Sequence, residues 1–142
     1  MLTVLLSYLL QSPAQQPLAM KDLAPQHQQW FSRGEMVEVL GQQMFTLKQG
    51  NASQTLILIH GFPTSSYDYH DVIDKLSQDF TVLVFDHLGF GFSDKPVDYT
   101  YSLVDQAEQT LSLWRQLGIR SISWEGTQSR NKIGKILSCI QL

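Results

Sequence analysis

Residues 55–63 read TLILIHGFP and residues 80–96 read FTVLVFDHLGFGFSDKP, and these two stretches decide the fold. Each opens with an unbroken apolar run, Thr55–Ile59 in the first and Phe80–Phe85 in the second. A strand covered by helices on both faces needs such a run, whereas a strand with one face in water alternates apolar and polar residues. Each run is followed by a segment with glycine and proline, which indicates a loop. We therefore expect two buried strands of an α/β fold.

The residues on either side complete a pattern of strands and helices. Residues 36–40 and Gln43–Gln49 indicate two strands, and Gly41 between them favours a tight hairpin. Helical spacing of apolar residues predicts one helix over Tyr67–Leu76 and another that begins at Ser102, with an acidic capping partner three residues later. This order predicts an α/β domain with a mixed, mostly parallel sheet and flanking helices.

Composition narrows the class of protein. Hydrophobic residues make up 43% of the 142 residues and charged residues 16%, which is typical of a globular domain and unlike a disordered chain. The single cysteine excludes an internal disulfide and a cysteine-rich zinc module. The net charge of -3 and the pI near 5.7 offer no basis for binding nucleic acid.

The amino-terminal residues form an apolar leader and a polar linker. Leu2–Leu10 is an apolar run of nine residues, and a spanning helix needs ~20. The length suits the core of a signal peptide, although no Lys or Arg precedes the run. Membrane association, cleavage and packing of this leader on the domain all stay open, and so does the choice between a cytoplasmic and a secretory location. Gln11–Gln29 is rich in Gln and Pro, so we interpret residues 1–30 as leader and linker.

The loop after Ile59 is the first candidate site. Ligands of open α/β sheets bind at the carboxyl ends of the strands. Gly61 lets the backbone approach a substrate closely, the N–H of Phe62 can then point into the site, and Pro63 stiffens the loop. A backbone donor placed there can stabilise an oxyanion and is typically worth ~3 kcal/mol of barrier. A tight strand-to-helix turn without a catalytic role explains the same residues equally well.

The turn from Asp86 to Pro96 is the second candidate. Gly89 and Gly91 resemble part of a phosphate-binding Gly-x-Gly, but Asp94 stands where the dinucleotide pattern needs a third glycine. We therefore reject dinucleotide binding and predict a structural turn in which Asp86 bonds backbone amides. Elsewhere, Asn51-Ala52-Ser53 matches the N-glycosylation sequon, a triplet that is also common by chance.

Taken together, the two stretches resemble the α/β-hydrolase family, and within it the epoxide-hydrolase and haloalkane-dehalogenase branch. The resemblance covers roughly residues 35–120 and rests on two motifs, each after a buried strand: His60-Gly61-Phe62-Pro63 and Asp86-x-x-Gly89-x-Gly91-x-Ser93-Asp94-Lys95-Pro96. It implies that residues 60–63 form the oxyanion loop and that the Phe62 N–H is one of its two donors. It also implies that Asp86–Pro96 is the conformational turn after the family's fourth strand. Dehalogenases of this branch usually carry Asn where Phe62 stands, so the resemblance favours epoxide or ester hydrolysis.

The resemblance ends near Arg120. The family next needs a strand and a nucleophile elbow, Gly-x-Ser-x-Gly or its Asp version, and residues 121–142 contain neither. No histidine follows His87. Residues 1–120 hold 7 basic and 12 acidic residues, whereas residues 121–142 hold 3 and 1. We expect residues 31–120 to be the amino-terminal half of the hydrolase domain, an incomplete core, and residues 121–142 to be a divergent tail from a frameshift, retained intron or alternative exon.

The resemblance implies a parent enzyme that hydrolyses a small apolar epoxide or ester through a covalent intermediate. It implies no metal and no organic cofactor. The 142-residue chain itself is expected to be inactive, because the nucleophile and the catalytic histidine are absent from it. The alternative is a non-enzymatic truncated form with a binding or membrane-associated role.

Overall fold

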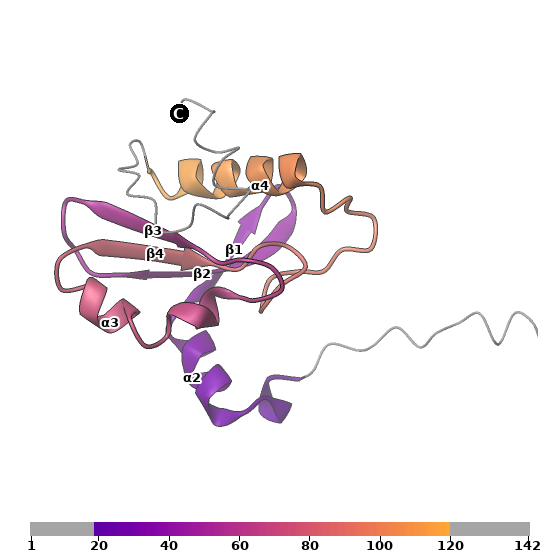
Figure 1. Cartoon of the computed structure of the whole chain (residues 1–142). Coiled ribbons are helices and arrows are strands. Elements are labelled where there is room, and N and C mark those ends of the chain that lie inside the picture. Colours follow the sequence, from indigo (N-terminus) through magenta and orange to yellow (C-terminus); the bar gives the residue numbers. More distant parts are fainter. Residues whose placement is uncertain (1–18, 120–142) are drawn as a thin grey trace, which may run out of the picture.

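The computed structural model describes residues 19–119, in which a four-stranded sheet lies between helices (Figure 1). The strands lie in the order β1-β2-β4-β3. Their bounds are Glu35–Val39 (β1), Gln42–Gln49 (β2), Thr55–Ile59 (β3) and Thr81–Phe85 (β4). The helices are the 3-10 turns Met20–Asp22 (η1) and Ser66–Tyr69 (η2) and the α-helices Pro25–Ser32 (α2), Ile73–Leu76 (α3) and Leu103–Gln116 (α4).

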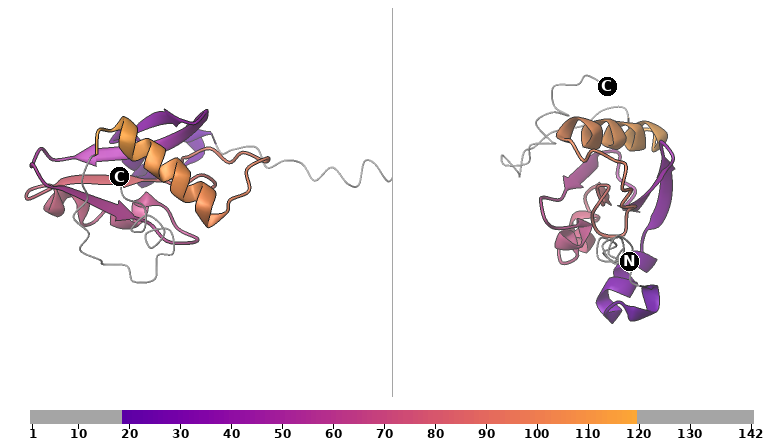
Figure 2. Two further views of the ribbon diagram at one scale, coloured as in Figure 1. Left: turned by 90° about the horizontal axis from the view of Figure 1, so that it is seen from above. Right: turned by 90° about the vertical axis from the view of Figure 1, so that its right-hand side faces the viewer.

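Helices cover both faces of the sheet, and this explains the apolar runs. Figures 1 and 2 place α4 on one side and α2 with α3 on the other. All five residues of β4 are buried. Leu83 and Phe85 pack on the α4 side, and Val82 and Val84 pack on the α2 side. Because both faces are dry, an alternating strand would place polar groups without partners in one of the two core layers.

Several predicted elements are confirmed. β3 has the predicted bounds, and β4 begins one residue later than predicted. The hairpin between β1 and β2 turns through Leu40 and Gly41, both at positive φ (49° and 78°), as a two-residue turn of this hand requires. Ser102 caps α4, and its side chain accepts the Asp105 N–H. The mixed sheet with flanking helices is confirmed as well.

The balance of parallel and antiparallel pairs differs from the expectation. Only β3 and β4 pair in parallel, whereas β1 with β2 and β2 with β4 are antiparallel. The sheet within residues 19–119 is therefore mixed but not mostly parallel. The reason is that the second strand of the hairpin, and not the first, lies against β4.

The helix predicted over Tyr67–Leu76 is wrong as one element. The chain forms η2, turns, and then forms α3. Val72, which the helical spacing placed on the buried face, is 44% exposed. Tyr69 instead anchors the segment, since its hydroxyl donates to the Ile59 carbonyl at 2.8 Å. Ile73, at the start of α3, is fully buried in the core.

The interpretation of Gln11–Gln29 as a linker is wrong from Pro25 onward, where α2 begins. Pro25 occupies the first helical position, where its missing N–H costs nothing. The buried residue of this helix is Trp30, whose indole N–H donates to the Ser66 hydroxyl at 3.2 Å. A helix that buries so little shows almost no apolar periodicity, so its composition resembles a linker.

The predicted leader and the predicted tail, residues 1–18 and 120–142, lie outside the described residues. Among the helices of residues 19–119, none has the length and apolar character to cross a bilayer.

Candidate functional site

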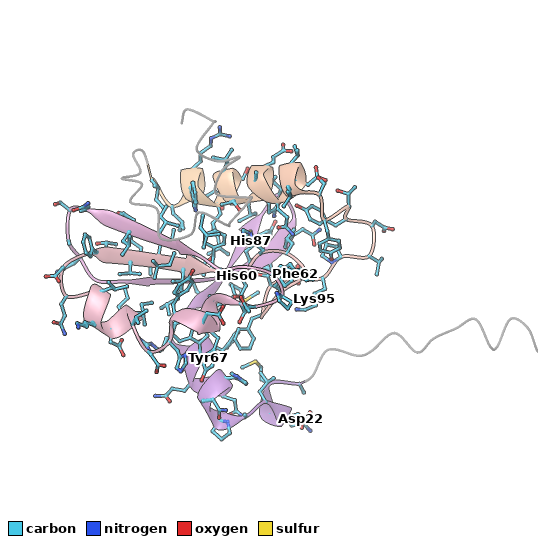
Figure 3. The ribbon with its side chains drawn as sticks, viewed as in Figure 1. Asp22, His60, Phe62, Tyr67, His87 and Lys95 are labelled. Carbon is cyan, nitrogen blue, oxygen red and sulfur yellow. The ribbon has the colours of Figure 1, made fainter. Side chains whose placement is uncertain are left out.

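The two sequence motifs meet at the carboxyl ends of β3 and β4. Because these strands are parallel neighbours and Ile59 pairs with Phe85, the next residues, His60 and Asp86, leave the sheet side by side. Figure 3 shows His60, Phe62 and His87 gathered at this end of the strands. The structure therefore brings together the loop and the turn that the sequence predicted separately.

His60 joins the two loops. Its ring is buried, and its Nε2 accepts the backbone N–H of His87 at 3.0 Å. A backbone N–H can only donate, so the ring proton resides on Nδ1, which lies 2.9 Å from the Gly61 carbonyl oxygen and donates to it. The imidazole thus holds the Gly61 peptide on one side and the start of the second loop on the other.

The Gly61–Phe62 peptide has a defined direction. The Gly61 carbonyl accepts from the Thr64 N–H at 3.1 Å, from the Thr64 hydroxyl at 3.0 Å and from His60. This peptide is trans, so its N–H points opposite to its C=O. The carbonyl faces into the loop, and the Phe62 N–H therefore faces out of it. Within residues 19–119 that N–H has no hydrogen-bond acceptor.

Apolar rings border this free donor. The Phe62 side chain is 86% exposed, and its ring lies edge-on to that of Phe90, with 5.9 Å between centroids. Phe90 in turn lies 5.6 Å from the His60 ring. Among residues 19–119, a Cβ added at Gly61 would meet no atom within 4 Å. Within the described residues, aromatic side chains therefore border the Phe62 N–H.

Asp86 organises the second loop. Its carboxylate is fully buried and accepts the Ser66 N–H at 2.7 Å and the Phe92 N–H at 2.8 Å. The bond to Phe92 lies within the turn, as the sequence predicted. The bond to Ser66 reaches η2, and sequence analysis missed it because 20 residues separate the partners. Gly91, at φ 47°, leaves room for the carboxylate, since a Cβ there would lie 1.9 Å from Oδ2.

Ser93 and Gly89 complete a structural turn. The Ser93 hydroxyl donates to the Asp86 carbonyl at 2.6 Å and accepts the Phe45 N–H at 2.9 Å, which ties the turn to β2. Gly89 lies at φ 89° against the Tyr101 ring, 2.6 Å from where a Cβ would stand. The Asp86 carboxylate and the Ser93 hydroxyl thus both make contacts that hold the turn.

His87 is a buried histidine to which sequence analysis assigned no role beyond the turn. Both its ring nitrogens lack a hydrogen-bond partner among the described residues, and its ring centroid lies 4.8 Å from that of His60. Burial, and secondarily the neighbouring His60, lowers its pKa to about 3. The imidazole is therefore neutral at physiological pH. Within the part of the chain that the structure describes, no three or more His, Cys, Asp or Glu side chains gather as a metal site.

Comparisons with known proteins agree with the observed fold. A family described as "alpha/beta hydrolase fold" matches residues 54–126, about half of the chain. The match includes six residues of the segment 121–142, which we expected to lie outside the family pattern. The mesoderm-specific transcript homolog protein of Bos taurus is 38% identical over 103 residues, which is 70% of this chain and 31% of that protein.

Solved structures agree with the sequence relatives. A haloalkane dehalogenase loop variant from Bradyrhizobium elkanii superposes with a TM-score of 0.59 at 31% identity, covering 63% of this chain and 29% of that one. A meta-cleavage product hydrolase from Pseudomonas fluorescens does so with a TM-score of 0.59 at 29% identity, covering 63% and 34%. The chain thus spans about a third of the length of its relatives.

Proposed function

Because the chain belongs to the α/β-hydrolase fold family, we propose that it carries the oxyanion side of a hydrolase site. In this proposal the Phe62 N–H binds the oxygen that becomes negative during hydrolysis of an epoxide or an ester. The observation that carries it is the direction of the Gly61–Phe62 peptide, whose carbonyl is held inside the loop by Thr64 and His60. A donor held this way needs no reorganisation when the charge develops.

The proposed reaction divides its roles between this loop and groups outside the 142-residue sequence. An attacking hydroxyl or carboxylate forms a covalent bond to substrate, and the leaving or carbonyl oxygen gains charge opposite the Phe62 N–H. A histidine then activates water to release the product. The sequence contains no Gly-x-Ser-x-Gly or Gly-x-Asp-x-Gly elbow and no histidine after His87. We therefore propose that the 142-residue chain on its own does not turn over substrate.

A small apolar substrate fits this proposal best. The exposed Phe62 ring and its neighbour Phe90 border the donor with apolar surface. Such a rim favours substrates whose reactive oxygen sits on an otherwise apolar body. Phe62 offers no side-chain amide for a halide, which supports epoxide or ester hydrolysis over dehalogenation.

The test is a chimera that supplies the missing groups. Residues 54–119 replace the matching segment of the Pseudomonas fluorescens meta-cleavage product hydrolase. Phe62→Pro removes the N–H, whereas Phe62→Ala removes only the ring and is the matched control. We expect Phe62→Pro to lower kcat by ~10²–10³-fold with a smaller change in KM, and Phe62→Ala to lower it far less.

Circular dichroism and a thermal melt establish first that each chimera is folded. A folded chimera in which Phe62→Pro keeps kcat within a few-fold of the parent chimera contradicts the assigned donor. A folded chimera without any hydrolysis contradicts the hydrolase proposal itself and favours a non-enzymatic role.

A further inference from the structure

The loop between β2 and β3 carries a feature that the proposed function does not use. It contains Asn51-Ala52-Ser53, the only Asn-x-Ser/Thr triplet in the 142 residues. Such a triplet is an acceptor for N-linked glycan only where it lies in an accessible surface loop of a chain that enters the secretory pathway. The structure tests the first of these conditions.

Both ends of the loop are held against the domain. The Ala52 carbonyl accepts the Thr81 hydroxyl at 2.7 Å, and the Gln54 carbonyl accepts the Thr81 N–H at 2.9 Å. Gly50, at φ 90°, packs so closely on the Phe80 carbonyl that a Cβ would lie 2.2 Å from its oxygen. The backbone of this short loop is thus anchored on residues 80 and 81.

The two sequon side chains, by contrast, face solvent. Asn51 and Ser53 are exposed, and the Ala52 carbonyl between them turns inward to Thr81. Neither side chain makes a hydrogen bond within residues 19–119. Neither the Asn51 amide nor the Ser53 hydroxyl is therefore needed to hold the fold, and a bulky group on Asn51 would extend away from the domain.

We propose that Asn51 is an N-glycosylation site. Its amide nitrogen Nδ2 forms a bond to the anomeric carbon of an oligosaccharide carried on a lipid diphosphate. The bond between that carbon and the diphosphate oxygen breaks, the lipid diphosphate leaves with the electron pair, and the amide releases one proton. The Ser53 hydroxyl, two residues on, is the group that makes the triplet an acceptor.

The position is compatible with a working site at the other end of the sheet. The loop with Asn51 precedes β3, and the His60–Pro63 loop follows β3. The five residues of this strand therefore separate the two loops by about 16 Å. Figures 1 and 3 show the β2–β3 connection at the opposite end of the strands from His60 and Phe62. A glycan on Asn51 therefore leaves the Phe62 N–H open.

The second condition, entry into the secretory pathway, rests on the sequence. The apolar run Leu2–Leu10 has the length of a signal-peptide core. Because the chain has a single cysteine, it cannot form a wrong internal disulfide in an oxidising compartment.

The experiment translates the full 142-residue chain with microsomes derived from endoplasmic reticulum and follows its mass on gels after protease treatment. We expect one discrete upward shift in the protease-protected chain, which a glycosidase specific for N-linked glycans removes. Asn51→Gln and Ser53→Ala abolish the shift, and Asn131→Gln, which alters the only other asparagine, keeps it.

A second version of the chain carries a known secretory signal ahead of Met1. If this version is protected but unshifted, the proposal is overturned, because the acceptor was presented and not used. If the chain without the added signal stays accessible to protease, the proposal is overturned for the natural chain, even where the fused version is modified. The readout is mass and not hydrolysis, so either result is independent of the proposed function.

Discussion

Single side chains hold the loops of the site in place by bonding across long sequence distances. His60 contacts the backbone 27 residues later, and Asp86 contacts the backbone 20 residues earlier. Each of these side chains hydrogen-bonds through two of its own polar atoms to two different backbone segments. Removal of His60 would leave the His87 N–H without its acceptor, and removal of Asp86 would leave the Ser66 and Phe92 N–H groups without theirs, at a cost of ~1–3 kcal/mol for each buried group. These two residues therefore hold the backbone at the carboxyl ends of β3 and β4.

His87 predicts a specific loss of stability in acid. Its pKa is about 3 in the folded chain and near 6.5 when unfolded, so between these values the unfolded state binds more protons. Stability from this group is therefore complete above pH 6.5 and falls as the pH drops towards 3. From pH 7 to pH 5 the expected loss in unfolding free energy is about 2 kcal/mol. Urea unfolding at several pH values measures it.

His87→Leu is expected to flatten this pH dependence, because it removes the titrating imidazole, whose two nitrogens have no hydrogen-bond partner within residues 19–119. His70→Gln serves as the control, since His70 is a surface residue whose Nε2 lies 3.1 Å from Asp71. Equal slopes for the wild type and His87→Leu would show that His87 is not the group that titrates.

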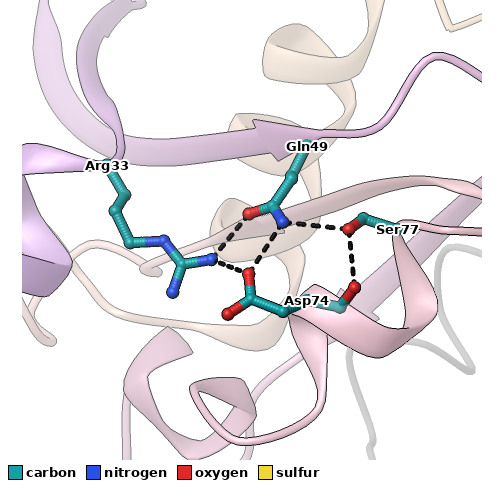
Figure 4. A network of polar contacts seen from close by, with 4 residues as sticks. All are labelled: Arg33, Gln49, Asp74 and Ser77. Carbon is teal, nitrogen blue, oxygen red and sulfur yellow. Dashed lines mark hydrogen bonds and ion pairs between the residues drawn. The ribbon is translucent and has the colours of Figure 1, made fainter.

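At the level of elements, α2 is secured by contacts at its carboxyl-terminal end. Trp30 is buried beneath the sheet, and the Arg33 guanidinium lies 5.2 Å over its ring. Arg33 also donates to Gln49 at 2.7 Å and pairs with Asp74 on α3. Figure 4 shows these groups as one network in which Gln49 also donates to Asp74 and Ser77. The carboxyl-terminal end of α2 thus contacts both β2 and α3.

Trp30→Ala tests whether α2 is part of the folded domain. We expect it to lower the unfolding free energy by ~3–5 kcal/mol, because a fully buried indole leaves a cavity. Trp30→Phe retains most of the apolar volume and loses the hydrogen bond to Ser66, so it is expected to cost less. Gln26→Ala, on the exposed face of α2, is expected to stay within ~0.5 kcal/mol.

Denaturant unfolding followed by circular dichroism distinguishes these variants. If this segment behaved as the linker that its composition suggested, Trp30→Ala would unfold at the same urea concentration as Gln26→Ala.

Across the whole molecule, the sheet divides the core into two layers, and β4 belongs to both. One layer lies under α4 and includes Leu83, Leu111 and Trp114. The other lies over α2 and α3 and includes Trp30 and Val84. β4 is also the one described strand whose neighbours on its two sides run in opposite directions. Opening β4 would therefore expose both layers and break two ladders at once.

Hydrogen exchange is expected to rank the strands accordingly. Amides of β4 should exchange only through global unfolding, at least ~10-fold more slowly than those of β1, which lies at one end of the described sheet. Exchange followed by NMR or mass spectrometry on overlapping peptides gives this ranking. Equal protection of β1 and β4 would mean that the hairpin and the centre of the sheet open as one unit.

The sequence alone determined the features that depend on neighbouring residues. The apolar run Thr55–Ile59, the turn at Gly41 and the cap at Ser102 each act within a few residues, so their patterns predicted the correct elements. The two motifs likewise predicted the family, which the comparisons confirm. The roles of His60–Pro63 stay a prediction.

Only the tertiary structure decided the features that depend on distant partners. α2 is a helix of the domain because Trp30 reaches Ser66, 36 residues away, and no local pattern encodes that contact. The hairpin lies against β4 in antiparallel orientation because β2, between Thr46 and Gln49, meets residues that come 36 or so positions later. The His60 ring, which contacts the Gly61 carbonyl, is itself fixed by the His87 N–H, 27 residues later in the chain. In each case the free energy comes from contacts that exist only once the chain has folded.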